Sequence, residues 1–306
     1  MKKLSIIGAA GGVGSTSAFY LGLCDLFEEI ALVDVKRDLL LSHALDIEQA
    51  VGGFNGTKFT AGSWEEMAGS DLVLLVASAP QPKAASRNEF LGINLGIVRS
   101  AIDAIKKYCP KALVFTATCP TDVFNYLIWR ELGGDRSKYI GFNRNDSVRL
   151  AWAAARVLGV PMHRVRGIVL GEHGETQVPI FSSITVDGKP ANLSAAQIKE
   201  VGTTVANFFT MQVGLDASRS STWLSPVSIS CVLRAICTGK QEGPIPASTV
   251  MDGEYGISGV SLGMPLMLGP NGWTEIAKLP LTDEELAALK ASGEHIKGLI
   301  AQCDSL

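Results

Sequence analysis

A glycine-rich turn near the start of the chain, set between a short apolar run and a longer amphipathic stretch, restricts the fold more than any other feature. Residues 4–7 lead directly into Gly8-Ala9-Ala10-Gly11-Gly12-Val13-Gly14. Apolar runs follow at residues 30–33, 71–76 and 112–115, and apolar side chains recur at helical spacing over residues 91–105. Buried strands that alternate with amphipathic helices are typical of a parallel sheet covered on both faces. The first half is therefore predicted to be a doubly wound α/β sheet that binds ligands at the carboxyl ends of its strands.

The same turn has the composition of a dinucleotide-binding loop. Glycine permits a tight turn and lets main-chain N–H groups approach a pyrophosphate at the positive end of the next helix. Asp34 ends the second strand about twenty residues further on, where a carboxylate can accept both ribose hydroxyls and repel a 2′-phosphate. This pattern predicts a Rossmann-type domain that prefers NAD over NADP, although Lys36 and Arg37 would weaken the preference. The alternative is a structural turn beside a solvated Asp34. The cofactor contacts expected from this pattern are Gly8, Gly11, Gly12, Val13, Gly14 and Asp34.

The pattern changes near residues 139–145, and a chain of 306 residues is long enough for two domains. We expect an NAD-binding domain at residues 1–141 and an α+β substrate domain at residues 142–306. In the second domain we predict helices over residues 146–158, 195–215 and 222–237, a strand before His173, and paired strands between residues 245 and 273. A capping box, Thr282-Asp283-Glu284-Glu285, predicts the start of the last helix.

Charge and cysteine usage restrict the classes of partner and compartment. A net charge of −3 disfavours nucleic acid and acidic membrane surfaces. The six cysteines are scattered without metal-type spacing, which indicates reduced thiols in the cytoplasm. Residues 4–7 are too short for the apolar core of a signal peptide. Pro265 and Pro270 interrupt the long uncharged segment near the C-terminus, so a membrane span is not expected there.

Three polar side chains form a candidate catalytic group. His173 lies in Gly171-Glu172-His173-Gly174-Glu175 after an apolar run, where the glycines allow a sharp turn into a cleft. Asp146 and Arg149 are one helical turn apart and would share a face. A carboxylate can hold one imidazole nitrogen while the other exchanges a proton, and a guanidinium matches a substrate carboxylate. The plainer interpretation of Asp146 and Arg149 is a surface ion pair. Arg87, in a polar loop after the strand that ends at Ala77, could add a cation to the site.

In this order, these segments resemble the NAD-dependent L-lactate/L-malate dehydrogenase family over essentially the whole chain. The resemblance also covers Leu45-Asp46, the loop from Gln81 to Arg87, residues 253–265 and Pro280-Leu281-Thr282. It implies hydride transfer between NAD and a small L-2-hydroxy acid. His173 would then be the proton acceptor, Asp146 its partner, Arg149 the anchor of the substrate carboxylate and Arg87 the group that polarises the carbonyl. Thr222 is expected to line the substrate pocket, and Ala77 and Asn94 are expected beside the cofactor. The family implies a homodimer or homotetramer, for which residues 13–23 and 151–158 are candidate contacts.

Two residues depart from the family pattern in ways that concern the substrate. The family has Asn-Pro-x-Asp where this chain reads Cys119-Pro120-Thr121-Asp122, and a thiol is a poor replacement for an amide that contacts substrate and ribose. Gln81 occupies the position where malate-specific relatives carry arginine, which favours a lactate-like monocarboxylate. The glycine turn itself is more like that of malate dehydrogenases, so malate stays an alternative. A further alternative is an NAD-binding sensor whose chemistry has been weakened by Cys119.

Asn143-Arg144-Asn145 replaces a stretch that normally ends in leucine. We interpret it as a polar helix N-terminus; the functional alternative is that Arg144 compensates the charge of a dicarboxylic acid. Ala151 stands where allosteric relatives carry arginine, so activation by a sugar bisphosphate is not expected. A metal site is not expected, because Cys119 and His173 would supply only two ligands without a spacing signature.

Overall fold

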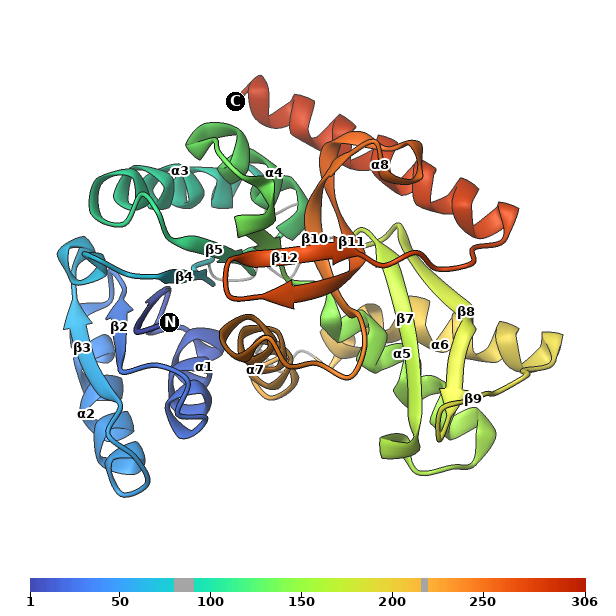
Figure 1. The fold of residues 1–306 in the computed structure, drawn as a ribbon, viewed down its shortest axis with the longest axis horizontal. Coiled ribbons are helices and arrows are strands. Elements are labelled where there is room, and N and C mark those ends of the chain that lie inside the picture. The colour runs from blue at the N-terminus through green and yellow to red at the C-terminus, as the bar shows by residue number, and fades with distance from the viewer. Residues whose placement is uncertain (80–90, 216–219) are drawn as a thin grey trace.

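The computed structural model describes residues 1–79, 91–215 and 220–306, and the twelve strands found within them join one mixed sheet (Figure 1). Eleven of these strands follow the order β3-β2-β1-β4-β5-β6-β10-β11-β7-β8-β9, and β12 pairs with β11. The strands are β1 (Lys3–Ile7), β2 (Glu29–Val33), β3 (Lys58–Gly62), β4 (Leu72–Leu75), β5 (Leu113–Thr116), β6 (Tyr139–Gly141), β7 (Val165–Gly171), β8 (Gln177–Val186), β9 (Lys189–Pro190), β10 (Ile245–Asp252), β11 (Ser258–Gly269) and β12 (Gly272–Ile276).

The part of the sheet from β3 to β6 is parallel and confirms the predicted doubly wound arrangement. β1 pairs with both β2 and β4, so the strand order reverses at β1, where the chain enters the glycine turn. β4, β5 and β6 continue the parallel ladder on one side, and β3 closes the other edge. The side chains of β1, β2, β4 and β5 are almost all buried, because helices cover both faces.

Helices lie on the two faces of this sheet in separate groups. The α-helices of the described residues are α1 (Gly12–Leu23), α2 (Arg37–Gly52), α3 (Leu91–Tyr108), α4 (Thr121–Leu132), α5 (Arg144–Leu158), α6 (Ala195–Gly214), α7 (Leu224–Thr238) and α8 (Asp283–Asp304). α1, α2 and α7 lie together on one side, while α3, α4 and α8 lie together on the other (Figure 1). α7 and α8 come from the second half of the sequence; α7 packs against α1 and β11, and α8 packs against α4, β11 and β8.

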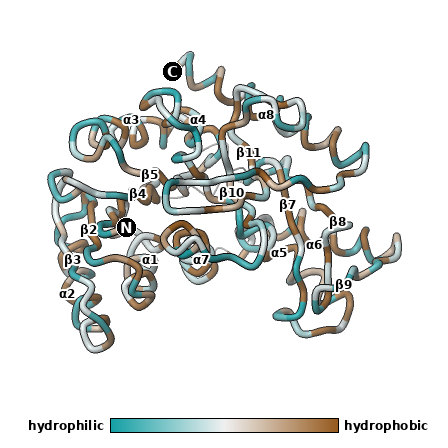
Figure 2. The backbone as a smooth tube through the Cα atoms, in the orientation of Figure 1, coloured by the Kyte–Doolittle hydropathy of each residue, from teal (hydrophilic) through white to brown (hydrophobic). Residues whose placement is uncertain are grey.

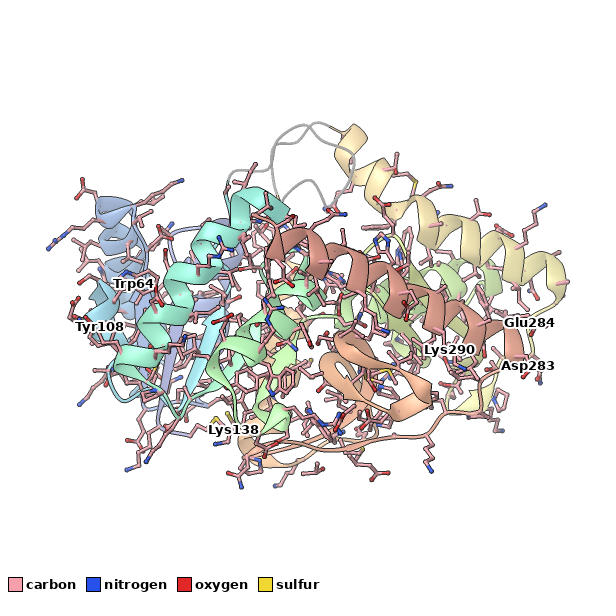
Figure 3. The ribbon with its side chains drawn as sticks, turned by 90° about the horizontal axis from the view of Figure 1, so that it is seen from above. Trp64, Tyr108, Lys138, Asp283, Glu284 and Lys290 are labelled. Atoms are coloured by element: carbon pink, nitrogen blue, oxygen red, sulfur yellow. The ribbon has the colours of Figure 1, made fainter. Side chains whose placement is uncertain are left out.

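The second half continues the sheet with antiparallel strands. β6 pairs with β10, which pairs with β11, and β11 pairs with β7 and β12. β7 and β8 form a hairpin whose connection holds His173, and α5 and α6 pack near it. The predicted helices and paired strands of this half are confirmed within a few residues. α8 begins with the predicted capping box between Thr282 and Glu285, and Figure 3 shows Asp283 and Glu284 at that end of the helix.

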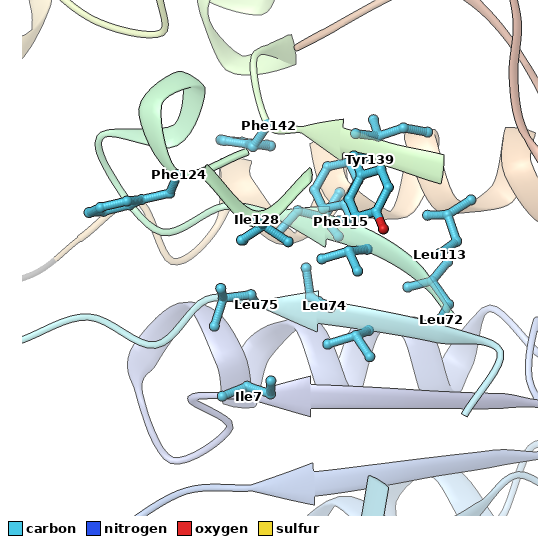
Figure 4. Packing of buried hydrophobic residues seen from close by; sticks show 14 of the residues in the cluster. Ile7, Leu72, Leu74, Leu75, Leu113, Phe115, Phe124, Ile128, Tyr139 and Phe142 are labelled. Atoms are coloured by element: carbon cyan, nitrogen blue, oxygen red, sulfur yellow. The ribbon is translucent and has the colours of Figure 1, made fainter. Parts of the chain in front are cut away.

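Two apolar clusters hold the structure together. The larger contains side chains from Leu4 to Cys303 and packs β4, β5 and β6 against α4, as Figure 4 shows for Leu74, Phe115 and Ile128. Figure 2 shows hydrophobic residues along β4 and β5. The smaller cluster lies among α5, β7, β8 and α6. It contains four buried alanines from the predicted subunit contact at residues 151–158, so this part of α5 belongs to the interior of the chain: Ala151, Ala153, Ala154 and Ala155.

A search of the described residues for membrane-spanning helices finds none with the necessary length and apolar character.

Candidate active site

The glycine turn passes so close to neighbouring main chain that a side chain cannot be accommodated at Gly8 or Gly14. Gly8 has a φ of +94°, and a Cβ there would lie 2.5 Å from the Cα of Ala77, two residues after β4. A Cβ on Gly14 would overlap the carbonyl oxygen of Gly8. α1 begins at Gly12, and Gly11 and Gly12 are exposed in front of its N-terminus. A bare, exposed helix N-terminus at the carboxyl end of β1 fits a pyrophosphate.

Asp34 lies beside this turn at the end of β2. Its Oδ2 accepts the Ala10 N–H at 3.0 Å, and its Oδ1 accepts the Lys36 N–H at 2.9 Å. The carboxylate is therefore oriented by the turn and stays partly exposed, as a residue that contacts a ribose would need to be. Together the turn and Asp34 fit the pyrophosphate and ribose of NAD. The structure thus brings Asp34 and the glycines predicted to contact the cofactor to one place.

Asn94 connects the loops that leave two neighbouring strands. It is fully buried on α3; its Oδ1 accepts the Ala79 N–H at 2.9 Å, and its Nδ2 donates to the Cys119 carbonyl at 2.9 Å. These bonds fix the segments after β4 and β5 relative to each other. The Cys119 thiol lies 3.8 Å from the Thr121 hydroxyl at the start of α4. The expectation that Asn94 also contacts the cofactor stays a prediction.

His173, Asp146 and Arg149 form one buried hydrogen-bonded group. His173 Nδ1 lies 2.5 Å from Asp146 Oδ2, and Arg149 Nη1 donates to Asp146 Oδ1 at 3.1 Å. Less than a tenth of each residue is exposed. The plainer interpretation of Asp146 and Arg149 as a surface pair is therefore wrong, because the ion pair is buried and its carboxylate also binds an imidazole. Burial strengthens each of these interactions relative to water.

Two aromatic rings that were not singled out in the sequence contact this group. Phe142 meets the His173 ring edge to face, with centroids 5.3 Å apart. The Arg149 guanidinium lies over the Phe208 ring of α6, 4.6 Å from its centroid. Such a contact restricts a flexible cation to one position at low desolvation cost. Phe142 directly precedes the polar run 143–145, which was a weak signal, whereas Phe208 could not be distinguished from an ordinary core residue.

The connection that carries His173 is held from two sides. The His173 N–H donates to Asp122 Oδ2 of α4 at 2.7 Å, and the Glu172 N–H donates to Ser292 Oγ of α8 at 2.9 Å. Burial raises the pKa of the Asp122 carboxyl to about 7, opposed by hydrogen bonds from the Ser248 hydroxyl and the His173 main chain. The sequence contained Asp122 within its family motif but gave it no role.

The remaining predicted residues have the following positions. Thr222 is half-buried, and a Cβ on Gly12 would lie 2.7 Å from its Cγ2, so the second half meets the glycine turn here. Gln81 and Arg87 lie outside the described residues.

α5 begins at Arg144 with Asn143 before it, which confirms the polar helix N-terminus, two residues earlier than predicted. Among the described residues, no group of three or more histidine, cysteine and acidic side chains could hold a metal ion.

Two family models together match almost the whole chain. Residues 2–141 match the lactate/malate dehydrogenase NAD binding domain, and residues 144–305 match the lactate/malate dehydrogenase alpha/beta C-terminal domain. The model matched by the first half confirms the prediction of an NAD-binding domain.

Curated relatives and solved structures agree with these models. Malate dehydrogenase from Dehalococcoides mccartyi is 35% identical over 98% of this chain and 99% of its own length. Malate dehydrogenase from Halobacterium salinarum is 30% identical over the full length of both. The crystal structure of Cryptosporidium parvum malate dehydrogenase matches with a TM-score of 0.94 at 29% identity, covering 100% of this chain and 99% of that one. Lactate dehydrogenase from the same organism, complexed with lactic acid and nicotinamide adenine dinucleotide, matches with a TM-score of 0.93 at 26% identity, covering 100% and 98%. The chain therefore belongs to the lactate/malate dehydrogenase family, whose members are NAD-dependent oxidoreductases.

Proposed function

We propose that this dehydrogenase interconverts a small L-2-hydroxy acid and its 2-oxo acid. The observation that carries the proposal is the buried group in which one carboxylate, Asp146, binds both the imidazole of His173 and the guanidinium of Arg149. Asp146 thereby holds a proton acceptor, His173, and an anchor for the substrate carboxylate, Arg149, at a fixed separation. An α-hydroxy carboxylate presents the matching pair of groups on adjacent carbons.

The proton would move through His173. Asp146 holds the Nδ1 side of the ring, so that the Nε2 side exchanges a proton with the substrate oxygen. When the hydroxyl proton arrives, the ring becomes positively charged and Asp146 stabilises that charge. When bound at the glycine turn and Asp34, NAD would supply the acceptor for the hydride from the substrate carbon that bears this oxygen. In the reverse direction His173 returns the proton to the oxygen.

The substrate carboxylate would pair with Arg149. Its guanidinium is already oriented by Asp146 on one side and by the Phe208 ring on another, so little side-chain entropy remains to be lost on binding. We expect Thr222 to line the substrate pocket; it lies beside Gly12 of the cofactor turn. Arg87 is expected to polarise the carbonyl.

For the substrate class, we propose a lactate-like monocarboxylate, because Gln81 offers no charge to a second carboxylate. Malate is the second candidate, and it is favoured by the names of relatives that are 30% to 35% identical. Cys119 in place of the family asparagine would slow turnover of either substrate. An NAD-binding sensor with little chemistry is the alternative from another functional class.

A spectrophotometric panel tests these proposals. NADH and NADPH oxidation is followed with pyruvate, oxaloacetate and longer 2-oxo acids, with the His173→Asn protein as the matched control. We expect NADH-dependent reduction of pyruvate-like acids and a loss of about 10⁴-fold in the control, because an amide cannot act as the base. A strong preference for oxaloacetate would refute the proposal that Gln81 favours a monocarboxylate. NADH binding without turnover of any acid would establish the sensor instead.

We also propose that residues 1–141 and 142–306 act as the cofactor and substrate domains, and that the protein works in the cytoplasm as a homodimer or homotetramer. Phe19, Tyr20 and Leu23 of α1 are more than a third exposed, which suits a subunit contact. Light scattering coupled to gel filtration measures the mass in solution, and a monomer at micromolar concentration would refute the assembly.

A further inference from the structure

Asp122 is a fully buried carboxyl group that reaches the catalytic histidine through the main chain. It lies in the first turn of α4, directly after the loop that leaves β5. Its Oδ2 accepts the His173 N–H at 2.7 Å, and its Oδ1 accepts the Ser248 hydroxyl of β10 at 2.5 Å. Both carboxyl oxygens of Asp122 therefore accept a hydrogen bond from within the protein, and one of the donors is the main chain of His173.

Behind Asp122, a buried polar cluster fixes its position. The Ser248 and Ser261 hydroxyls lie 2.8 Å apart, and Asn125 Nδ2 donates to Ser261 Oγ at 2.8 Å. These residues belong to α4, β10 and β11, and all of them are buried. Because the cluster has partners on a helix and two paired strands, the carboxyl of Asp122 cannot shift without breaking several hydrogen bonds.

The segment that carries His173 needs such external support. Glycines lie on both sides of the histidine, Gly171 with a φ of +80° and Gly174, so two positions of the connection are conformationally permissive. Within the connection the Thr176 N–H donates to Glu172 Oε2 at 2.9 Å, whereas the His173 N–H is bonded to another element, α4. The imidazole must nevertheless stay 2.5 Å from Asp146, which belongs to a different element. A displacement of about 1 Å at a catalytic group is sufficient to cost two orders of magnitude in rate.

We propose that Asp122 is a positioning residue for the reaction: through the His173 N–H it fixes the main chain at the base, and so aligns the imidazole with Asp146 and the substrate. The role of His173 as base rests on the proposed function. The positioning itself does not, because the hydrogen bond and the buried cluster involve only residues of this chain.

The competing interpretation is that Asp122 only stabilises the fold, and Asn125 provides the matched control. Asn125 is also fully buried, lies one turn further along α4, and bonds to the same cluster through Ser261. Its hydrogen bonds go to Ser261 and to the Tyr139 carbonyl, away from His173. Removing Asn125 therefore weakens the cluster while leaving the Asp122–His173 bond in place.

The kinetic test compares Asp122→Ala, Asp122→Asn and Asn125→Ala. We expect the single-turnover rate of NADH oxidation to fall about 10- to 100-fold in Asp122→Ala, with the KM for the 2-oxo acid within about 3-fold, because Arg149 is untouched. Asp122→Asn should restore the rate to within about 3-fold, since an amide oxygen can accept the His173 N–H and its NH₂ can bond Ser248. Asn125→Ala should lose thermal stability but keep its rate. Asp122→Leu, which matches the size of the side chain, replaces the alanine variant if that one does not fold.

A second measurement works without turnover and separates this proposal from the proposed function. In ¹⁵N-histidine NMR of the unliganded protein, the His173 Nδ1 proton bonded to Asp146 should be observable in the wild type, Asp122→Asn and Asn125→Ala. It should broaden or disappear in Asp122→Ala or Asp122→Leu. If this signal persists there, or if Asn125→Ala slows turnover as much as Asp122→Ala, the positioning role is refuted. If the wild type turns over no 2-oxo acid, the proposed function fails and the NMR comparison still decides the role of Asp122.

Discussion

Replacement of Asp122 by asparagine is expected to change how the stability of the protein depends on pH. Burial raises the pKa of this carboxyl to about 7 in the folded state, while its usual value of 3.8 applies to the unfolded chain. Between these two values the folded protein keeps a proton that the unfolded chain has lost, so the free energy of unfolding decreases as the pH rises, and it levels off above the folded pKa. The slope is about 1.4 kcal/mol per pH unit, which gives about 3 kcal/mol between pH 5 and pH 8.

The assay is urea denaturation of wild type and Asp122→Asn at half-unit steps across this range, at one protein concentration. Asparagine does not ionise, so the variant should gain about 3 kcal/mol relative to wild type between pH 5 and pH 8. Asp304→Asn serves as the control, because hydrogen bonds from Arg130 lower the pKa of Asp304 and leave it ionised throughout the range in both states. Parallel stability curves for wild type and Asp122→Asn would refute the argument that burial holds a proton on Asp122.

Three further substitutions test separate parts of the site. Cys119→Asn restores the family residue and should raise kcat about 10-fold, because an amide donates a stronger hydrogen bond than a thiol; an unchanged or lower kcat would count against this. Asp34→Ser removes the charge that repels a 2′-phosphate, so the ratio of kcat/KM for NADH over NADPH should fall at least about 10-fold; an unchanged ratio would remove Asp34 from cofactor selection. Phe208→Leu removes the ring under the Arg149 guanidinium and should raise the KM for the 2-oxo acid about 5-fold, as expected for a contact of about 1 kcal/mol; a change confined to the unfolding midpoint would show that the ring acts only in packing.

The parallel half of the fold could be predicted because its central strands are buried on both faces and therefore read as continuous apolar runs. β3 and β6 could not be predicted in the same way. β3 lies at the edge of the sheet and alternates Phe59 and Ala61 with polar residues, and β6 has only three residues. Short and peripheral strands carry too few apolar side chains for periodicity to be visible. The capping box of α8 was visible because its signal is contained in four neighbouring residues.

In the site, too, contacts between residues close in sequence could be predicted, and contacts between distant residues could not. Asp146 and Arg149 could be paired from the sequence because helical geometry places residues three apart on one face. Their burial could not be predicted, because it depends on α6 and on the connection after β7. Asp122 and His173 are 51 positions apart and meet through a main-chain N–H, which leaves no trace in residue type or spacing. Contacts of this kind depend on the tertiary arrangement alone.

The pairing of β6 with β10 has a consequence for how the chain can be divided (Figure 1). The two halves match separate family models, yet one hydrogen-bonded ladder crosses between them and one apolar cluster contains side chains of both. Cutting the chain after Gly141 would leave bare strand edges and uncovered apolar surface on both fragments, which favours aggregation. Neither half is therefore a module that could be expressed or exchanged alone, and two fragments would be recovered intact only if they were produced together and assembled around the shared ladder.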